Sequence, residues 1–294
     1  MKRFIMVAFI ITIGNQTYAQ LNENTFSFNY GLTPIGHDDI DFYKTDFKFN
    51  IPMKVNNGVL IHSLGFENYC VNYTKDFSFS TEDITKLYNI NYGLKYKLPI
   101  AQTWLLTTSA EVAIVSNLVN TINSNDLLVT GSLLASKTLG AEDHAESLTF
   151  GLSYTTITGK PSILPVVSYT KQVNDKFSFG VGFPETFAYY KINNISSIQS
   201  VLKMDGVYAN LNNAVGINTT TNAEKLSLSS TSLGLGYNYA MDDSWSISFN
   251  GGYALSNNFE LLNIDDDTVY NFETESKPFF SAGITFNIKT QTKK

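Results

Sequence analysis

Residues 88–98 read Tyr-Asn-Ile-Asn-Tyr-Gly-Leu-Lys-Tyr-Lys-Leu, with an apolar or aromatic side chain at every second position and Asn, Gly or Lys between. Successive side chains of a β-strand point to opposite faces, so this period of two predicts a strand with one apolar and one polar face. The same alternation recurs at 26–32, 47–53 and 280–288. Together these segments predict an all-β fold.

Ten weaker segments extend the same pattern along the rest of the chain. They are 59–73, 104–115, 126–136, 147–156, 163–171, 176–183, 188–193, 196–207, 226–239 and 244–255. The total is about fourteen antiparallel strands. If 126–136 is helical, the number of strands falls to twelve, so this segment decides between the two strand numbers.

Short and long connections alternate between these strands. The short connections are 56–58, 99–103, 174–175, 193–194 and 241–243. The connection 137–146 belongs to the same set and is somewhat longer. The intervening ones, mostly longer, are 33–41, 74–85, 116–125, 158–161, the Pro184-Glu185 corner, 208–225 and 256–277. Outer-membrane barrels place short turns on the periplasmic side and longer loops outside, so the alternation favours such a barrel.

The first residues have the organisation of a secretory signal peptide. Lys2 and Arg3 precede an apolar run at 4–13, and small Ala19 ends the segment. We therefore expect a signal peptide at 1–19 and one barrel domain at 20–294, delivered by the export and barrel-assembly machinery. A buried N-terminal strand is the alternative. Beyond Ala19 no uninterrupted apolar run reaches the ~18 to 20 residues of a membrane helix, so any membrane span must consist of strands.

The composition excludes several classes of protein. Aromatic residues make up 14% of the chain and charged residues only 16%, which suits paired strands. Cys70 is the single cysteine, so no intramolecular disulfide is possible. The net charge of −6 and the scattered basic residues argue against a nucleic-acid partner. Aromatic residues near strand ends, Tyr73 and Trp104 among them, fit interfacial girdles, although a soluble β-protein with an aromatic core is an open alternative.

Closure into a single transmembrane barrel follows from hydrogen bonding. Fourteen strands in an open sheet leave two unpaired edges, and each unsatisfied backbone group in hydrocarbon costs several kcal/mol. The apolar faces then contact outer-membrane lipid and the polar faces line the lumen. The lumen-facing candidates are Lys48, Lys95, Lys97, Glu111, Lys203 and Asp205. Their mixed charge predicts ion pairs inside a lumen large enough to admit small solutes.

The residues that carry chemistry predict no catalytic, cofactor-binding or metal site. His37, His62 and His144 share no metal-ligand spacing. Ser63 is adjacent to His62 and must point to the opposite face of the strand. The acidic run 265–267 has no calcium-loop glycine or terminal Glu, which favours a solvated loop. We therefore expect a protein that is not an enzyme.

Three motifs resemble an uncharacterised outer-membrane barrel family common in Bacteroidota. They are Leu164-Pro165-Val166-Val167, Asp175-Lys176-Phe177-Ser178 and Gly182-Phe183-Pro184. The resemblance spans the mature chain and implies a fold and an outer-membrane location, without an activity. The leading functional expectation is porin-like, passive or facilitated passage of small solutes. The alternatives are a structural or surface-interaction barrel and, least favoured, a lipid-modifying enzyme.

Overall fold

The computed structural model describes residues 24–33, 40–140, 145–272 and 274–288. The expected signal peptide, His37 and His144 lie outside these residues. None of the helices in the described part has the length and apolar character needed to cross a bilayer.

The described residues form strands and two single-turn 3-10 helices. The strands are β1 (Phe26–Thr33), β2 (Ile40–Val55), β3 (Gly58–Tyr73), β4 (Lys86–Ala101), β5 (Trp104–Ser116), β6 (Leu127–Thr138), β7 (Glu146–Thr155), β8 (Ser162–Gln172), β9 (Phe177–Phe183), β10 (Glu185–Lys191), β11 (Ser196–Gly216), β12 (Asn222–Ala240), β13 (Trp245–Leu262), β14 (Thr268–Asn271) and β15 (Lys277–Phe286). The 3-10 helices are η1 (Glu82–Ile84) and η2 (Ser124–Asp126).

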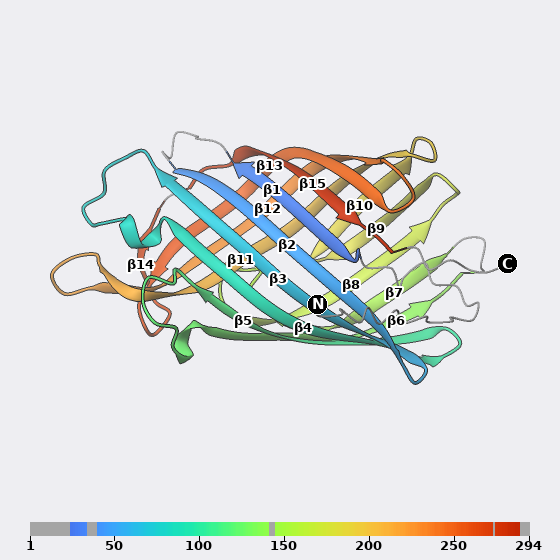
Figure 1. Ribbon diagram of the computed structural model, residues 1–294, viewed down its shortest axis with the longest axis horizontal. Helices are drawn as coiled ribbons and strands as arrows, with labels where there is room; N and C mark the ends of the chain where they lie inside the picture. The colour runs from blue at the N-terminus through green and yellow to red at the C-terminus, as the bar shows by residue number, and fades with distance from the viewer. Residues whose placement is uncertain (1–23, 34–39, 141–144, 273, 289–294) are drawn as a thin grey trace, which may run out of the picture.

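Within the described residues, fourteen of these strands close into one antiparallel barrel (Figure 1). Each pairs with its neighbours in the chain, and β1 pairs with β15 from Phe26 opposite Phe286 to Leu32 opposite Phe280. The short β14 joins only β13 and lies outside this ring. Because 127–136 lies within β6, the strand number is fourteen and not twelve. The prediction of an all-β barrel with fourteen strands is confirmed.

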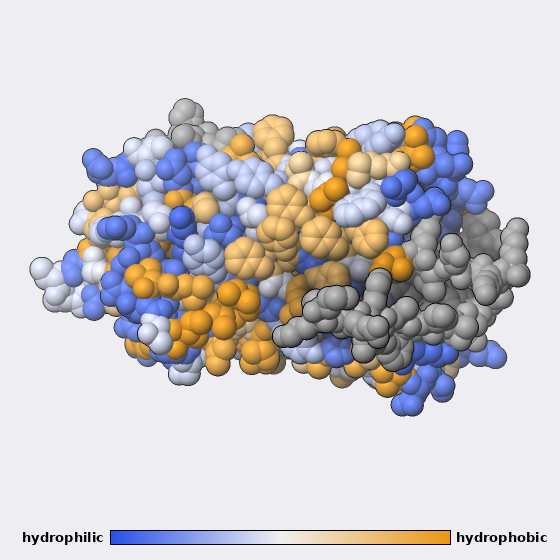
Figure 2. Space-filling model, viewed as in Figure 1, coloured by the Kyte–Doolittle hydropathy of each residue, from blue (hydrophilic) through white to orange (hydrophobic). Residues whose placement is uncertain are grey.

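The outer surface of the barrel carries the apolar side chains of each alternating strand. Phe47, Phe49 and Ile51 are each 42–44% exposed, and Leu235 is 70% exposed. Hydrophilic residues gather at the two ends of the molecule, with apolar residues between them (Figure 2). Such a band on a closed barrel is the surface that a lipid bilayer covers.

The two ends of the barrel differ in the length of their connections. One end has tight turns, several of them closed by an Asx motif in which a side-chain Oδ1 accepts two backbone N–H bonds. Asn174, Asn193 and Asp242 do so at three of the expected turns. Asn56 has φ of 51° between β2 and β3, as a hairpin turn requires. These turns are confirmed, and we call this end the periplasmic end after the usual arrangement of outer-membrane barrels.

The opposite end, which we call the outer end, contains more strand than the sequence predicts. The expected loop 208–225 is mostly the β11–β12 hairpin, whose connection is only 217–221. The expected loop 256–277 holds the end of β13 and all of β14. Alternate apolar residues in these extensions are buried, and their burial stabilises strand in Asn- and Thr-rich sequence.

Candidate functional site

The inner face of the barrel carries the polar half of each alternating strand. In the register, Ser63 of β3, Gly93 of β4 and Glu111 of β5 lie side by side. Lys48 of β2 lies opposite Gly65 of β3. Glycine beside a long charged side chain leaves space inside the wall, so the backbone pattern itself creates a cavity here.

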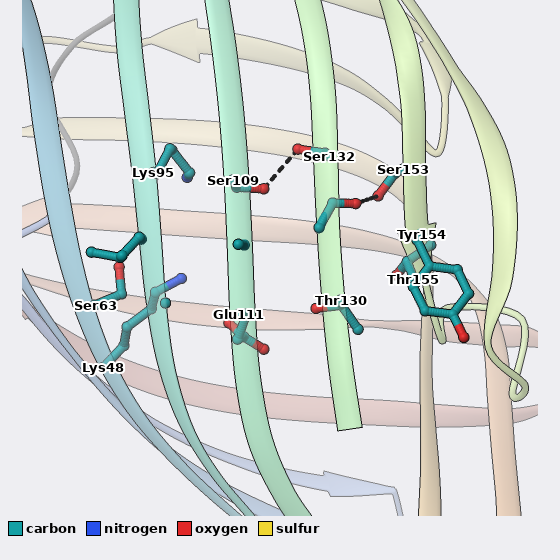
Figure 3. Close-up of a pocket in the computed structure, with 14 residues that line it drawn as sticks. Lys48, Ser63, Lys95, Ser109, Glu111, Thr130, Ser132, Ser153, Tyr154 and Thr155 are labelled. Atoms are coloured by element: carbon teal, nitrogen blue, oxygen red, sulfur yellow. Dashed lines mark hydrogen bonds between the residues drawn. The ribbon is translucent and has the colours of Figure 1, made fainter. Parts of the chain in front are cut away.

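A cavity of about 170 Å³ lies against this wall, and three of the predicted lumen residues line it (Figure 3). Lys48, Lys95 and Glu111 supply the charges, from three nearby strands. Hydroxyl groups complete the lining, with Ser109 and Ser132 hydrogen-bonded at 2.7 Å. These hydroxyl residues are Ser63, Ser109, Thr130, Ser132, Ser153 and Thr155. The cavity therefore offers both charges and many neutral donors and acceptors to a polar molecule.

A second charged group lies nearer the outer end and spans the lumen. The ammonium of Lys44 on β2 is 3.2 Å from the Glu67 carboxylate on β3 and 3.7 Å from the Asp205 carboxylate on β11. Asp46 accepts a hydrogen bond from Asn29 at 3.2 Å. Sequence reasoning missed Lys44, Asp46 and Glu67, although Lys44 and Asp46 continue the even-numbered alternation of Lys48. Extending the predicted strand 47–53 toward its N-terminal side would have identified Lys44 and Asp46 as lumen-facing residues.

The remaining lumen candidates fall outside the cavity. Lys203 acts electrostatically on Asp46 and Asp205 and lies opposite Glu185 in the register. Lys97 is only 8% exposed and lies two residues from Lys95 toward the periplasmic end. The structure therefore brings Lys48, Lys95 and Glu111 together, places Lys203 and Asp205 in the second group, and leaves Lys97 apart.

An apolar core fills the barrel at its outer end. It joins β2–β5 to the extensions of β11, β12 and β13, and Ile40, Leu226 and Phe259 within it are fully buried. Phe259 stacks on Phe272 with ring centroids 4.2 Å apart. Tyr73 packs against Phe259 and Phe272, so its expected place in an interfacial girdle is wrong. Its ring is covered by other aromatic rings, which excludes it from the membrane surface.

The core is possible because β11 crosses the mouth of the barrel. Asn210 of β11 forms a parallel bridge with Ser116 of β5, although β6 to β10 separate these two strands around the sheet. The intervening strands are shorter, and β9 and β10 have only seven residues each. The long extensions therefore fold over the short strands and close the outer end.

Asp126 is the centre of a polar cluster that holds this closure, which we call the outer latch and define as Ser116, Asp126, Asn210 and Asn212. Asn210 and Asn212 each donate an amide N–H to the Asp126 carboxylate, at 2.8 and 2.7 Å. The Ser116 hydroxyl donates to the Asn212 amide oxygen at 2.9 Å. Asp126 is 1% exposed and Ser116 is fully buried, so the carboxylate is shielded from water.

The Asp126 carboxylate is also bound by its own loop. The backbone N–H of Asn123 donates to it at 2.7 Å, in a capping box at the start of η2. Burial acts to raise the pKa of Asp126, but the hydrogen bonds from Asn123, Asn210 and Asn212 outweigh it and hold the pKa below its ordinary value. The latch therefore contains an ionised aspartate.

The β7–β8 loop covers the other face of the β11–β12 extension. Gly159 has φ of 89° and approaches Ser227 so closely that a side chain at this position would collide with it. Lys160 donates to the backbone oxygen of Asp266 at 2.7 Å. Lys225 and Tyr208 donate to the Asp266 carboxylate. Burial acts to raise the pKa of Asp266, but the hydrogen bonds from Lys225 and Tyr208 outweigh it and lower the pKa below its ordinary value. The acidic run 265–267 was expected to be a solvated loop, and the Asp266 side chain is 45% exposed while it also bonds Lys225 and Tyr208.

His62 and Ser63 lie on opposite faces of β3, as predicted. The Nδ1 atom of His62 is 2.6 Å from the Tyr92 hydroxyl, on the same face as exposed Leu64. Ser63 instead donates to the Asn50 amide oxygen inside the barrel. In the part of the chain that the structure describes, no three His, Cys, Asp or Glu side chains come together as metal ligands.

Solved structures of outer-membrane proteins are similar to the chain at low sequence identity. Three similar solved structures are an outer membrane channel from Pseudomonas putida F1, the NanC porin and the outer membrane phospholipase A from Escherichia coli. Their sequence identities are 10%, 12% and 9%, and their TM-scores are 0.46, 0.41 and 0.39. The alignments cover 94%, 90% and 93% of this chain and 100%, 100% and 94% of theirs.

No curated protein matched the chain. A family model does match it, over residues 33–290. The chain therefore belongs to the family described as Domain of unknown function (DUF6268).

Proposed function

We propose that this protein is an outer-membrane channel for passive or facilitated passage of small polar solutes. The observation that carries the proposal is the cavity with Lys48, Lys95 and Glu111 inside a barrel whose outer surface is apolar. Removing a charged side chain from water costs several kcal/mol unless other groups solvate it. Charges retained inside a membrane-spanning protein usually line a path for polar molecules.

The contrast with the outer end supports this proposal. There the interior is filled with packed apolar side chains such as Leu226 and Phe259. The same chain could fill its middle in that way, and instead it places ammonium, carboxylate and hydroxyl groups around a space. A solute that crosses the barrel must then pass the outer latch, so we propose that the channel alternates between this closed state and an open one.

Solute flux into proteoliposomes tests the proposal. Vesicles containing the wild-type barrel are expected to swell in arabinose and much more slowly in the trisaccharide raffinose. Gly93→Phe places a ring in the cavity beside Glu111 and Ser63 and should reduce the arabinose rate. Absence of swelling with the wild type and with a latch-broken variant would refute channel function.

The sealed outer end supports a second candidate, a structural or surface-interaction barrel without transport. The long extensions of β11–β13 present ordered polar edges, and the apolar core below them resembles that of a stable domain. If no variant conducts, this candidate replaces the channel. We propose no catalytic activity, because His62 and Ser63 face opposite sides of their strand.

We also propose that the protein is exported with a signal peptide cleaved after Ala19 and is inserted into a Bacteroidota-type outer membrane by the barrel-assembly machinery. The charged start and apolar run of 1–19 support this proposal. N-terminal sequencing of the mature protein should begin at Gln20. An intact Met1 in the purified outer-membrane fraction would contradict it.

A further inference from the structure

Two walls of the lumen carry complementary charges directly below the apolar core. On β2, Lys44 and Asp46 follow Phe42, which packs against the core, on the same face of the strand. On β11, Lys203 and Asp205 precede the residues that enter the core. Counted from the core, β2 therefore presents its cation first and β11 its anion first. We call Lys44, Asp46, Lys203 and Asp205 the charge layer.

The charge layer joins walls that are far apart around the barrel. The strands β1, β15, β13 and β12 lie between β2 and β11 on the shorter way round. That distance along the wall is about 24 Å, at ~4.8 Å for each step between neighbouring strands. The Lys44 ammonium is nonetheless 3.7 Å from the Asp205 carboxylate, and Lys203 acts electrostatically on Asp46. Opposite charges thus meet across the lumen at this level.

The outer part of β11 has a neighbouring strand on only one side. β10 pairs with β11 as far as Lys203, which lies opposite Glu185. Among the described pairings, 204–209 pair with β12 alone, and Asn210 then reaches β5 across the mouth. This part of β11 is therefore not held to the wall by a continuous hydrogen-bonded ladder on both edges.

A β-bulge marks the level at which this part of the sheet bends. The register of β12 with β13 shifts at Thr231, which leaves Leu255 of β13 as the extra residue. Thr231 lies opposite Met204 of β11. Because a bulge bends its strand, the sheet turns over the mouth at the level where β11 leaves β10. The bent part, which we call the flap, consists of 204–231 of β11 and β12 and 255–262 of β13.

Lys44 contacts one carboxylate on the fixed wall and one on the flap. Glu67, at 3.2 Å, lies on β3, which pairs with β2 along its length, so this contact does not depend on the flap. Asp205 lies on the flap, so the contact at 3.7 Å requires the flap in its present position. The side chains of Lys44 and Asp205 are 29% and 52% exposed, which lets water and dissolved ions reach this contact.

We infer that the flap moves about this bend and that the charge layer fastens it, so that dissolved salt regulates the opening of the barrel. The inference rests on the proposed channel, because it names the gate of that channel and the condition that opens it. The screening length is ~10 Å at 0.1 M salt and ~3 Å at 1 M, where it no longer exceeds the contact between Lys44 and Asp205. High salt therefore weakens this fastening and leaves the apolar contacts of the flap in place.

Amide hydrogen exchange of the full-length barrel in lipid nanodiscs measures flap opening without any current. An ion pair this exposed shifts an equilibrium by up to about fivefold. Exchange of 207–216 should therefore be about two- to fivefold faster in 1 M than in 0.1 M potassium chloride. The strand β4, in the fixed wall, is the internal reference and should exchange at an unchanged rate. Sucrose of equal osmolarity should have no effect on either segment.

Three variants show whether the charge layer is responsible. Asp205→Asn should exchange at the high-salt rate already in 0.1 M potassium chloride and lose the response to salt. Asp205→Glu keeps the charge and should retain the response. Glu67→Gln is the matched control, because it removes the carboxylate that Lys44 contacts on the fixed wall, and it should also retain the response. Circular dichroism and heat-modified electrophoretic mobility confirm that each barrel is folded.

Open probability in planar bilayers, measured over the same range of salt, separates this inference from the channel. It should rise with salt in the wild type and stay constant in Asp205→Asn. Salt-dependent exchange in a barrel that carries no current supports the fastening and refutes the channel. A current, with exchange and open probability that salt leaves unchanged, overturns the inference and leaves the channel standing. A salt response that Asp205→Asn retains also overturns it, because another contact would then hold the flap.

Discussion

Breaking the outer latch should open the barrel, and Asp126→Ala is the most selective way to do so. Asp126 accepts hydrogen bonds from Asn210 and Asn212 of β11 at 2.7–2.8 Å, across the mouth of the barrel. Each hydrogen bond to a charged group contributes about 1.5–3 kcal/mol, so the two contribute about 3–6 kcal/mol. At about 1.4 kcal/mol for each factor of ten, the ratio of closed to open barrel should fall by at least about a hundredfold.

Single-channel recording in planar bilayers measures this change as open probability. The apolar core around Phe259 remains in the variant, so the closed state should persist with shorter dwell times. Asp126→Asn keeps one acceptor oxygen without the charge and should give an intermediate value. Asp175→Ala, in a periplasmic turn, is the control and should behave as the wild type. An Asp126→Ala barrel that folds normally and keeps the wild-type open probability would refute the role of the latch.

Three further changes test the closure and the membrane surface. In a Cys70→Ser background, the double substitution Ser116→Cys and Asn210→Cys should form a disulfide across the parallel bridge. Oxidation should then lower the current, and a reductant should restore it. Equal currents in the oxidised and reduced barrel would count against closure at this position. Leu235→Arg puts a charge on a side chain that is 70% exposed to lipid and should destabilise the barrel by about 2–4 kcal/mol in urea unfolding from vesicles, whereas no change would place this face outside the bilayer. Because the pKa of Asp126 is lowered in the folded barrel, its stabilising charge is fully present above the ordinary pKa of 3.8 and is lost as the pH falls through the lower folded value. Open probability should therefore rise only below about pH 3.8. Opening at about pH 5 would show that another group controls the latch.

The fold could be predicted from the sequence because each barrel strand carries its own signal. The alternation around Tyr88 and Tyr92 predicts which face of the strand is apolar and faces outward. Hairpin turns such as the one at Asn56 fix the register with the next strand. Since each of the fourteen barrel strands pairs with the next barrel strand along the chain, an even number of strands lets the first and last pair antiparallel. The segment that becomes β6 supplied that number.

The outer end could not be predicted, because it depends on contacts between distant parts of the chain. Asn210 and Asn212 read as loop residues, and they become strand only when β11 reaches β5 across the barrel. Buried Asp126 gives no signal in a stretch of Asn and Ser. The cavity could be predicted only in part. The alternation identified Lys48, Lys95 and Glu111 as inward-facing candidates, but their proximity depends on the strand register.

In the proposed channel, charged residues of the lumen line a path for small solutes. The most direct test is the reversal potential of Asp126→Ala barrels in planar bilayers under a potassium chloride gradient, with and without Lys48→Glu. We expect a current with a preference for anions, which Lys48→Glu shifts toward cations. A barrel that carries no current, or a reversal potential that Lys48→Glu leaves unchanged, would contradict it.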